Sequence, residues 1–436
     1  MKRNLLAVLG LLSSCAFANN ISDKMAEDAF IYAYPMVQDY DFFYETAIKP
    51  DYPLNQFQNI RKLADDTYTE HPTINNDTIH LMGWLDVAVE PVVVTIPDMD
   101  KGRYWILHTM DMGHYTDAMI GSRTRGTKGG RFMFASKNWH GEVPKSVTQV
   151  IRVDSDLVKL MGRIMAINPQ DEVIAQNYMD QWNVRTLSQY LGVKGPKAKQ
   201  RQYPNPKTTN WIEIANFVLC EGILADADKK WLSQYKAIGL APCKKELTQD
   251  QLEAAKIGKK LGMKKIIELA PKMTDARQAL GTRESLGNSP REEFAVGVYL
   301  GQWGLPPVEA MYLKTDVDSK GKKLNGTHRN YKMRFKAPDV SGFWSVTVYS
   351  ADNRLMAHNE LNRHSRGDRT LKPDSEGYYT ILLSSDEQSN KANDNFLPIP
   401  EKDFYLILRL YGASKAIQAG EYKMPAVVPV QSREGL

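Results

Sequence analysis

Residues 92–107, VVVTIPDMDKGRYWIL, contain two short runs rich in β-branched and aromatic residues. The runs are 92–96 and 104–107, and both residue types are enriched in strands. Pro97 and the Asp100-Lys101-Gly102 sequence stand between them, and such residues favour turns. Short strands at this spacing, joined by such turns, predict an antiparallel sandwich or barrel.

The strand pattern extends outward over about residues 77–153 and returns beyond Leu300. Further predicted strands are 132–135, 147–153, 331–336, 343–349, 378–383 and 404–410. Elsewhere apolar residues recur at helical spacing. Predicted helices are 23–49 after the N-cap Ser22, 171–191 before the C-cap Gly192, 210–224, 226–237, and 248–269 with a Thr248/Gln251 capping box. Pro35 is expected to kink or divide the first helix.

The composition is that of a folded globular chain. Of 436 residues, 42% are hydrophobic and 25% charged, and 21 Tyr and 8 Trp favour a packed core over disorder. The formal net charge is +5, with basic and acidic residues interspersed. Nucleic-acid binding normally needs a concentrated basic face, so no nucleic-acid partner is predicted.

The N-terminus has the pattern of a secretory signal peptide covering residues 1–18. Lys2 and Arg3 precede an apolar run at 5–12, which is too short to span a membrane, and Ala16-Phe17-Ala18 forms a small-x-small cleavage site. An alternative is a lipobox, Leu12-Ser13-Ser14-Cys15, which would place a lipid anchor on Cys15. Both interpretations predict export, to the periplasm or medium in the first case and to the outer membrane as a lipoprotein in the second. No later stretch predicts a transmembrane helix.

Two cysteines, Cys220 and Cys243, follow the leader. Export would allow a disulfide between them, and two separate buried thiols are the alternative. Neither cysteine has a Cys or His neighbour at ligand spacing. The sequence therefore predicts no metal site, and no cofactor motif is present.

Motifs in both halves of the chain resemble a known bacterial family. In the N-terminal half these are Asn76-Asp77-Thr78, Gly83-Trp84-Leu85-Asp86 and Ile120-Gly121-Ser122-Arg123-Thr124. They resemble the family called domain of unknown function 1254. In the C-terminal half they are Phe343-Trp344-Ser345-Val346-Thr347, Asn362-Arg363-His364-Ser365, Gly367-Asp368-Arg369, Leu397-Pro398-Ile399-Pro400 and Arg409-Leu410-Tyr411-Gly412. They resemble its usual partner, domain of unknown function 1214, although Phe396 stands where Trp is expected.

The resemblance implies a mainly β, α+β fold with two antiparallel β-sandwich or jelly-roll-like modules and a helical middle. The expected division is 19–195 for the first module, 196–300 for a helical connecting region and 301–436 for the second module. The resemblance brings no agreed catalytic residues. Function must therefore be inferred from the residues themselves.

A first candidate site is the motif around Asp77. An Asp close in sequence to a His, here His80, can orient its imidazole. Asn76, Thr78 and Trp84 are the candidate ligand contacts of this region. The alternative is a tight turn, because Asn, Asp and Thr side chains readily bond their own backbone.

A second candidate site follows the strand that ends near Met110. It contains Asp111, His114, Tyr115, Asp117 and Arg123. His114 or Tyr115 would exchange a proton, Arg123 would hold substrate charge, and Asp111 would orient His114. The alternative is a loop anchored by an Arg–Asp pair.

A third candidate site lies in the C-terminal half. Its residues are Asn359, Asn362, Arg363, His364, Arg366, Asp368 and Arg369. Cationic and amide groups outnumber the single carboxylate, so an anion or sugar hydroxyls would suit this segment. The alternative is a long connection held by ion pairs.

The sequence lacks a Gly-x-Ser-x-Gly elbow, a phosphate-binding loop and a His-Glu-x-x-His motif. The Asp316–Gly321 segment begins like a calcium loop, but Lys320 occupies a ligand position, so a hairpin turn is predicted. The first hypothesis is an exported hydrolase or lyase that acts on a small or saccharide-like substrate in a cleft between the β modules. The second is a non-catalytic ligand- or glycan-binding module, and the third an envelope scaffold. The oligomeric state stays open, a homo-oligomer included.

The enzyme hypothesis depends on one geometric condition. The polar side chains that follow residues 104–110 must converge with those near Asp77 in one shared hollow.

Overall fold

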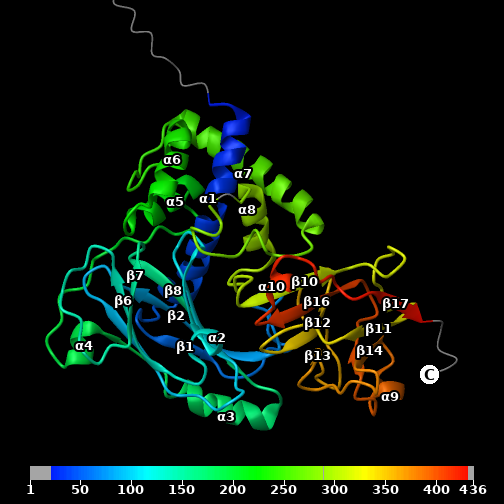
Figure 1. Cartoon of the computed structure of the whole chain (residues 1–436). Coiled ribbons are helices and arrows are strands. Elements are labelled where there is room, and N and C mark those ends of the chain that lie inside the picture. Colours follow the sequence, from blue (N-terminus) through cyan, green and yellow to red (C-terminus); the bar gives the residue numbers. More distant parts are fainter. Residues whose placement is uncertain (1–20, 288, 431–436) are drawn as a thin grey trace, which may run out of the picture.

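The computed structural model describes residues 21–287 and 289–430. The predicted leader, its cleavage site and Cys15 lie outside the described residues. Four sheets, in which antiparallel pairs predominate, combine with helices in a mainly β, mixed α+β fold (Figure 1). This confirms the predicted fold class.

The N-terminal module is a sandwich of two sheets with strand orders β1-β2-β8-β4-β5 and β7-β6-β3-β9. The strands are β1 (Phe57–Ile60), β2 (Thr78–Asp86), β3 (Val92–Ile96), β4 (Trp105–Met110), β5 (Thr116–Gly121), β6 (Gly130–Ser136), β7 (Gln149–Val153), β8 (Leu157–Met165) and β9 (Asn183–Thr186). The two runs of residues 92–107 form β3 and β4, which lie in opposite sheets. The turn between them therefore crosses from one layer of the sandwich to the other.

The five-stranded sheet is buried on both faces. Successive residues of a strand point to opposite sides. Leu81 of β2 and Leu160 of β8 belong to the sandwich core, whereas Met82 and Met161, one position further along, pack beneath the helices. The second face is thus covered by other parts of the chain.

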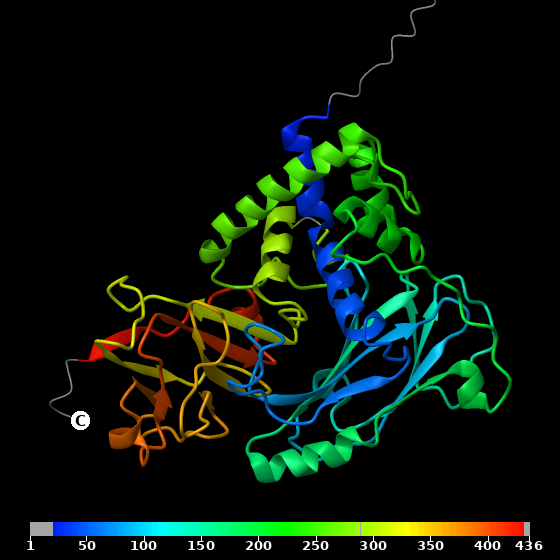
Figure 2. The same ribbon diagram turned by 180° about the vertical axis from the view of Figure 1, so that it is seen from behind.

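A helical layer covers that second face (Figures 1 and 2). Its helices are α1 (Asp23–Phe43), α5 (Trp211–Cys220), α6 (Asp226–Tyr235), α7 (Gln249–Leu269) and α8 (Arg291–Leu300), with short turns at Lys236–Ile238 and Ala270–Lys272. The remaining helices of the N-terminal half are α2 (Ser122–Arg125), α3 (Pro169–Met179) and α4 (Leu187–Leu191).

The central helix α1 packs closely against α7. Ser22 caps α1 as predicted, and Pro35 does not divide the helix, which runs to Phe43 and ends in a π-helical turn at Tyr44–Ile48. A Cβ atom at Gly258 of α7 would lie 2.4 Å from the carbonyl oxygen of Ala26. Only glycine permits this approach of the two backbones.

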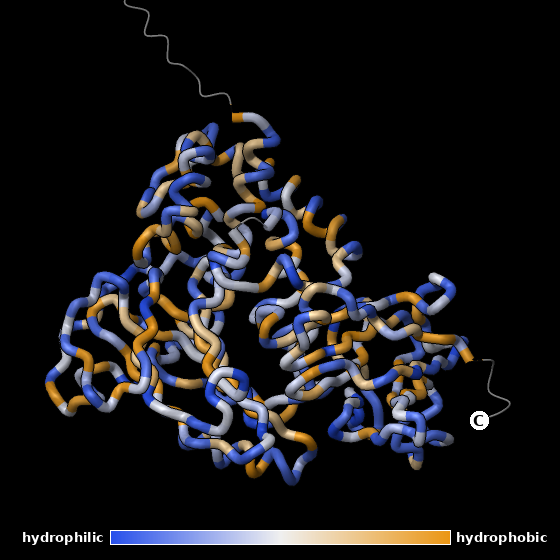
Figure 3. Tube along the Cα trace, in the orientation of Figure 1, coloured by the Kyte–Doolittle hydropathy of each residue, from blue (hydrophilic) through white to orange (hydrophobic). Residues whose placement is uncertain are grey.

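The C-terminal module is a sandwich of two four-stranded sheets, β10-β16-β12-β13 and β15-β14-β11-β17. Its elements are β10 (Ala310–Thr315), β11 (Asn330–Lys336), β12 (Trp344–Ser350), β13 (Ser365–Gly367), β14 (Tyr378–Ser384), α9 (Glu387–Asn390), β15 (Phe396–Pro398), β16 (Phe404–Tyr411), α10 (Lys415–Gln418) and β17 (Val427–Val430). Along the described residues, short hydrophobic and hydrophilic stretches alternate (Figure 3).

The predicted single helix 171–191 is wrong. The chain forms α3, then strand β9, then α4, with Gly192 as the predicted C-cap. The apolar residues that indicated a helix include Val173 and Ile174, which are 56% and 45% exposed. Here β9 pairs with β3, and this pairing supplies hydrogen-bond partners for the backbone of both strands. The spacing of apolar residues along one segment carries no information about such a distant partner.

Other local predictions are confirmed. Thr248 and Gln251 form a capping box at the start of α7. The carboxylate of Asp318 accepts hydrogen bonds from the backbone N–H groups of Lys320 and Lys322, which makes the calcium-like segment a turn. Within the described ranges, no helix combines the length and apolarity needed to cross a bilayer.

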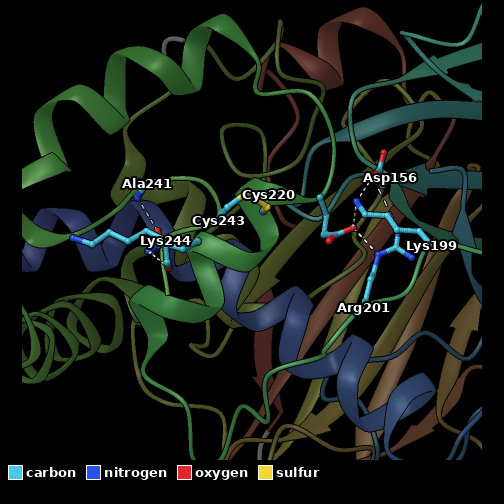
Figure 4. Close-up of a disulfide and its surroundings, with 9 residues drawn as sticks. Asp156, Lys199, Arg201, Cys220, Ala241, Cys243 and Lys244 are labelled. Carbon is cyan, nitrogen blue, oxygen red and sulfur yellow. Dashed lines mark hydrogen bonds and ion pairs between the residues drawn. A yellow bond between two sulfur atoms is a disulfide. The ribbon is translucent and has the colours of Figure 1, made fainter. Parts of the chain in front are cut away.

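Cys220 and Cys243 form a disulfide, with their Cα atoms 4.8 Å apart (Figure 4). It joins the end of α5 to the loop before α7. Beside it, Lys199 and Arg201 pair with Glu221, and Arg201 also pairs with Asp86 at 2.6 Å. The disulfide thus cross-links the helical layer, and the ion pairs of Arg201 with Glu221 and Asp86 connect this region to the N-terminal sandwich.

We expect the double variant Cys220→Ser/Cys243→Ser to lose about 3 kcal/mol of unfolding free energy, because cross-linking a loop of this length restricts the unfolded chain. Urea denaturation of the oxidised wild type and the variant measures the loss. The wild type with its disulfide reduced should match the variant. An unchanged urea midpoint would show that the cross-link does not stabilise the fold.

Candidate functional site

The two β modules meet through the outer faces of two sheets. On β8, Ile164 packs into the sandwich core, whereas Met165 contacts the C-terminal module. On β16, Leu410 lies in the core of the C-terminal module and Tyr411 faces the N-terminal module. Strand alternation therefore directs Met165 of β8 and Tyr411 of β16 into the interface between the modules.

A cavity of about 390 Å³, here called the interface cavity, lies in this region. Its walls come from β2, β8, β10 and β16, the loop 68–75, the end of α8 and the turn 301–304 that follows it. Its apolar side chains include Ile60, Met82, Met161, Leu280, Leu300, Trp303 and Ile407.

Two buried arginines line the interface cavity. Arg163 of β8 is 6% exposed; its Nη2 donates to the Trp303 carbonyl at 2.5 Å, and its Nη1 has no hydrogen-bond partner among the described residues. Arg409 of β16 donates to Thr347, Tyr349 and the Thr73 carbonyl, each at 2.8–2.9 Å. Neither guanidinium forms an ion pair with a carboxylate within the described part of the chain. Asp77 attracts Arg409 without contacting it, so the positive charge of the cavity wall is balanced only at a distance.

Two uncharged histidines stand next to the arginines. Burial, aided by the positive charge of Lys159, lowers the pKa of His71 to about 4. Burial lowers the pKa of His80 well below its usual range, and Arg163 adds to this effect. His71 Nδ1 is hydrogen-bonded to the Tyr68 hydroxyl. His71 Nε2 and His80 Nδ1 have no partner among the described residues, so each neutral ring keeps one unused nitrogen.

The cavity is closed on one side by Trp303, whose backbone lies in the left-handed region at φ +67°. A residue other than glycine rarely adopts this backbone conformation unless surrounding contacts hold it there. The indole ring packs against Phe42 and Trp84, and the Lys159 ammonium lies 4.7 Å from its centre. The indole Nε1 has no partner within the described residues.

The second predicted site, after β4, is occupied by internal contacts. Asp111 accepts from the backbone N–H groups of Gly113 and Tyr115 and pairs with Arg283 at 2.7 Å. His114 is fully buried and bonds Asp39 at 2.8 Å. Tyr115 bonds Arg291, and Arg123 pairs with Glu309 at 2.7 Å. These contacts fit the alternative interpretation, an anchored loop.

The first predicted site lies elsewhere, at the module interface. Asp77 accepts hydrogen bonds from Ser345 at 2.8 Å and Tyr411 at 3.1 Å. Asn75, through its side chain, accepts from the backbone of Asp77 and Thr78, which forms the tight turn considered above. Trp84 packs under the helices and donates to Thr46. Asp77 and Asp111 line separate cavities, so the condition of one shared hollow is not met.

The first and third predicted sites do converge. Asn76, Asp77, Asn362, Arg363 and His364 line one cavity of about 610 Å³, here called the arginine cavity. Ser365 donates to the side chain of Asn76 at 3.1 Å across the modules. Two motifs almost 290 residues apart in sequence thus form one surface.

Arg163, Arg409, His71 and Trp303 were not predicted from the sequence. The two arginines had a usable signal, because each places a charge in a largely apolar strand: LVKLMGRIM for β8, which also contains Lys159, and FYLILRLY for β16. A charge in such a strand is buried and must find a partner. His71 and Trp303 stand in loops and had no comparable signal. Within the described ranges, no group of three or more His, Cys, Asp or Glu side chains is placed to hold a metal ion.

Comparison with known proteins identifies relatives but no activity. Residues 54–186 match the family described as protein of unknown function DUF1254, and residues 309–415 match protein of unknown function DUF1214. No curated protein matches the chain.

Among solved structures, the chain is similar to the VPA0106 protein from Vibrio parahaemolyticus. The two are 62% identical over 94% of this chain and 100% of that one, with a TM-score of 0.82. An uncharacterized protein from Burkholderia cenocepacia shares the fold, at 11% identity over 93% and 88% of the two chains and a TM-score of 0.50. The order of the two matched regions and the close Vibrio relative agree with the resemblance in the sequence motifs, and the chain belongs to the family that joins DUF1254 to DUF1214.

Proposed function

We propose that this chain is an exported protein that binds a small, largely apolar molecule with one acidic group in the interface cavity. The observation that carries the proposal is the pair of buried guanidinium groups, Arg163 and Arg409, which have no carboxylate partner in the described chain. A buried charge is costly unless it is paired. A carboxylate of a ligand would supply that pairing.

The rest of the wall supports an apolar body for the ligand. Met82, Met161, Leu280, Leu300 and Ile407 offer contacts that gain from removing apolar surface from water. The volume of about 390 Å³ falls in the range of roughly 300–1,000 Å³ common for small-molecule sites.

Export rests on two independent features. The first 18 residues have the order of regions found in signal peptides. Disulfides such as Cys220–Cys243 persist mainly in oxidising compartments outside the cytoplasm. Together they favour the periplasm or the medium.

Catalysis in the same cavity is a second candidate, favoured by His71. Its imidazole is unprotonated at neutral pH because burial lowers its pKa to about 4. Tyr68 holds Nδ1, and Nε2 has no partner within the described residues. A neutral, oriented imidazole in the same cavity as two arginines suits proton abstraction from a bound acid, as in a lyase. The hydrolase or lyase hypothesis thus moves from His114 to His71.

Binding should depend on Arg163. We expect decanoate to raise the melting temperature of the wild type and decanol not to, because only the acid pairs with the guanidinium groups. Arg163→Met should weaken decanoate binding at least 10-fold, since hydrogen bonds to a charged group contribute about 1.5–3 kcal/mol. Calorimetric titration measures the affinity.

The matched control is Arg334→Met, which removes an exposed arginine on β11 that pairs with Asp374 and Glu376. It should leave decanoate affinity unchanged. Arg163→Lys keeps the charge and serves if the Met variant fails to fold. Equal affinity of the wild type and both Arg163 variants would contradict the proposed site.

The pKa of His71 also predicts a pH dependence of stability. In the folded state the pKa is about 4, below the ordinary value of 6.5, so the unfolded chain binds the proton more readily. Stability should therefore fall as the pH drops from 6.5 towards 4. We expect His71→Gln, which cannot be protonated, to lose about 2 kcal/mol less than the wild type between pH 7 and pH 5.

Urea denaturation at both pH values measures this difference. His358→Gln is the control, because His358 is exposed and its carboxylate neighbours raise its pKa instead of lowering it. Identical acid sensitivity of His71→Gln and the wild type would show that His71 is already protonated or fully solvated in the fold.

We expect the mature protein from an envelope fraction to begin at Asn19, the residue after the predicted cleavage site. Intact-mass spectrometry checks this directly. A mass that corresponds to acylated Cys15 at the N-terminus would assign the protein to the lipoproteins, and an uncleaved Met1 would remove the proposal of export by signal cleavage.

A further inference from the structure

The arginine cavity, on the other side of Asp77 from the interface cavity, contains four cationic side chains. These are Lys62, Arg363, Arg366 and Arg369. Of these, Lys62, Arg363 and Arg366 form no ion pair within the described chain, and Arg369 lies 3.9 Å from Asp368. The cavity wall therefore carries positive charge, and like the interface cavity it lies between the two modules.

The guanidinium groups of Arg363 and Arg366 converge. Arg363 Nη1 donates to the Phe396 carbonyl at 3.3 Å, and Arg366 Nε donates to the same oxygen at 3.2 Å. Burial, together with the like charge of Arg363, lowers the pKa of Arg366 to about 10. Two guanidinium groups that share one neutral acceptor repel each other, and the charge of Asp394, which forms no ion pair with either group in the described chain, offsets this only in part.

The acidic residues of the cavity are engaged elsewhere. Asp65 accepts from the backbone and hydroxyl of Thr67. Asp77 accepts from Ser345 and Tyr411. Glu172 accepts from the backbone N–H of Leu63. None of the three neutralises the arginines by direct contact.

Polar uncharged groups surround the cations. Asn76, Asn168, Asn362, Ser365 and Thr370 contribute amides and hydroxyls to the wall. Amides and hydroxyls can both donate to and accept from the hydroxyl groups of a ligand. Asn362 stands at φ +47°, a left-handed conformation that Asn tolerates better than most residues. The wall thus differs from that of the interface cavity, where apolar side chains predominate.

We propose that the arginine cavity is a second ligand site, which binds the oxyanion group of a small polar molecule through Arg363 and Arg366. A carboxylate or sulfate accepts from two guanidinium groups at once in short, charge-assisted hydrogen bonds. The surrounding amides and hydroxyls suit a hydroxylated body, so an acidic saccharide fits the cavity best. This site does not depend on the proposed function of the interface cavity.

The test uses the whole mature protein and four probes: digalacturonate, its neutral methyl ester, sodium sulfate and sodium phosphate. Calorimetric titration of the wild type should show binding of digalacturonate that weakens with added salt, because screening reduces attraction between charges. The methyl ester should bind at least 10-fold more weakly. The double variant Arg363→Met/Arg366→Met should also bind digalacturonate at least 10-fold more weakly.

Arg334→Met is again the matched control and should bind as the wild type does. Arg163→Met should also leave digalacturonate binding intact, which separates this site from the interface cavity. If the double variant does not fold, Arg366→Gln alone takes its place.

Binding of sulfate or phosphate alone, lost in the arginine variant, would support the oxyanion site and assign it to a free inorganic anion. No binding of any anionic probe by the wild type would overturn the proposal. So would equal affinity of the wild type and the arginine variant.

Discussion

The structure depends on a sheet that buries charge on its second face. Lys159 of β8 lies among the helices, where its ammonium bonds Asp39 of α1 at 2.6 Å, and Asp39 also bonds His114. Burial alone would raise the pKa of Asp39, but His114 and Lys159 hold it below its ordinary range. Because an unpaired charge at this depth is prohibitively costly, α1 can pack on the sheet only in the register that brings Asp39 to Lys159.

The same face explains why the cavities lie where they do. Four residues further along β8, Arg163 has left the cover of α1 and reaches the C-terminal module. Asp77, just before β2, also reaches the C-terminal module, where Ser345 and Tyr411 donate hydrogen bonds to its carboxylate. Tyr411 lines the interface cavity and Ser345 the arginine cavity, so one carboxylate separates two chambers of different chemistry.

Local sequence signals predicted elements better than they predicted sites. Runs such as Val92–Ile96 and Phe404–Tyr411 indicate strands because side-chain type alone favours them. The strand that pairs with β9 is distant in sequence, which is why the local sequence of β9 predicts part of a helix. Asp111 and His114 form a polar cluster in the sequence and so suggest a site. Polar residues that are close in sequence can equally stabilise a loop by hydrogen bonds to its own backbone. Arg163 and Arg409 meet only through the packing of two modules about 250 residues apart, and no single segment contains that information.

The interface cavity and the arginine cavity are both bounded by residues of the two β modules. A rigid rotation of the C-terminal sandwich against the N-terminal one, about the hydrogen bonds of Asp77, would enlarge one chamber while it narrows the other. With such a rotation, a ligand that fills either chamber would favour the orientations that accommodate it, and the occupancy of one chamber would be thermodynamically linked to that of the other. Asp77 would then lie at the axis of this rotation, between the two chambers.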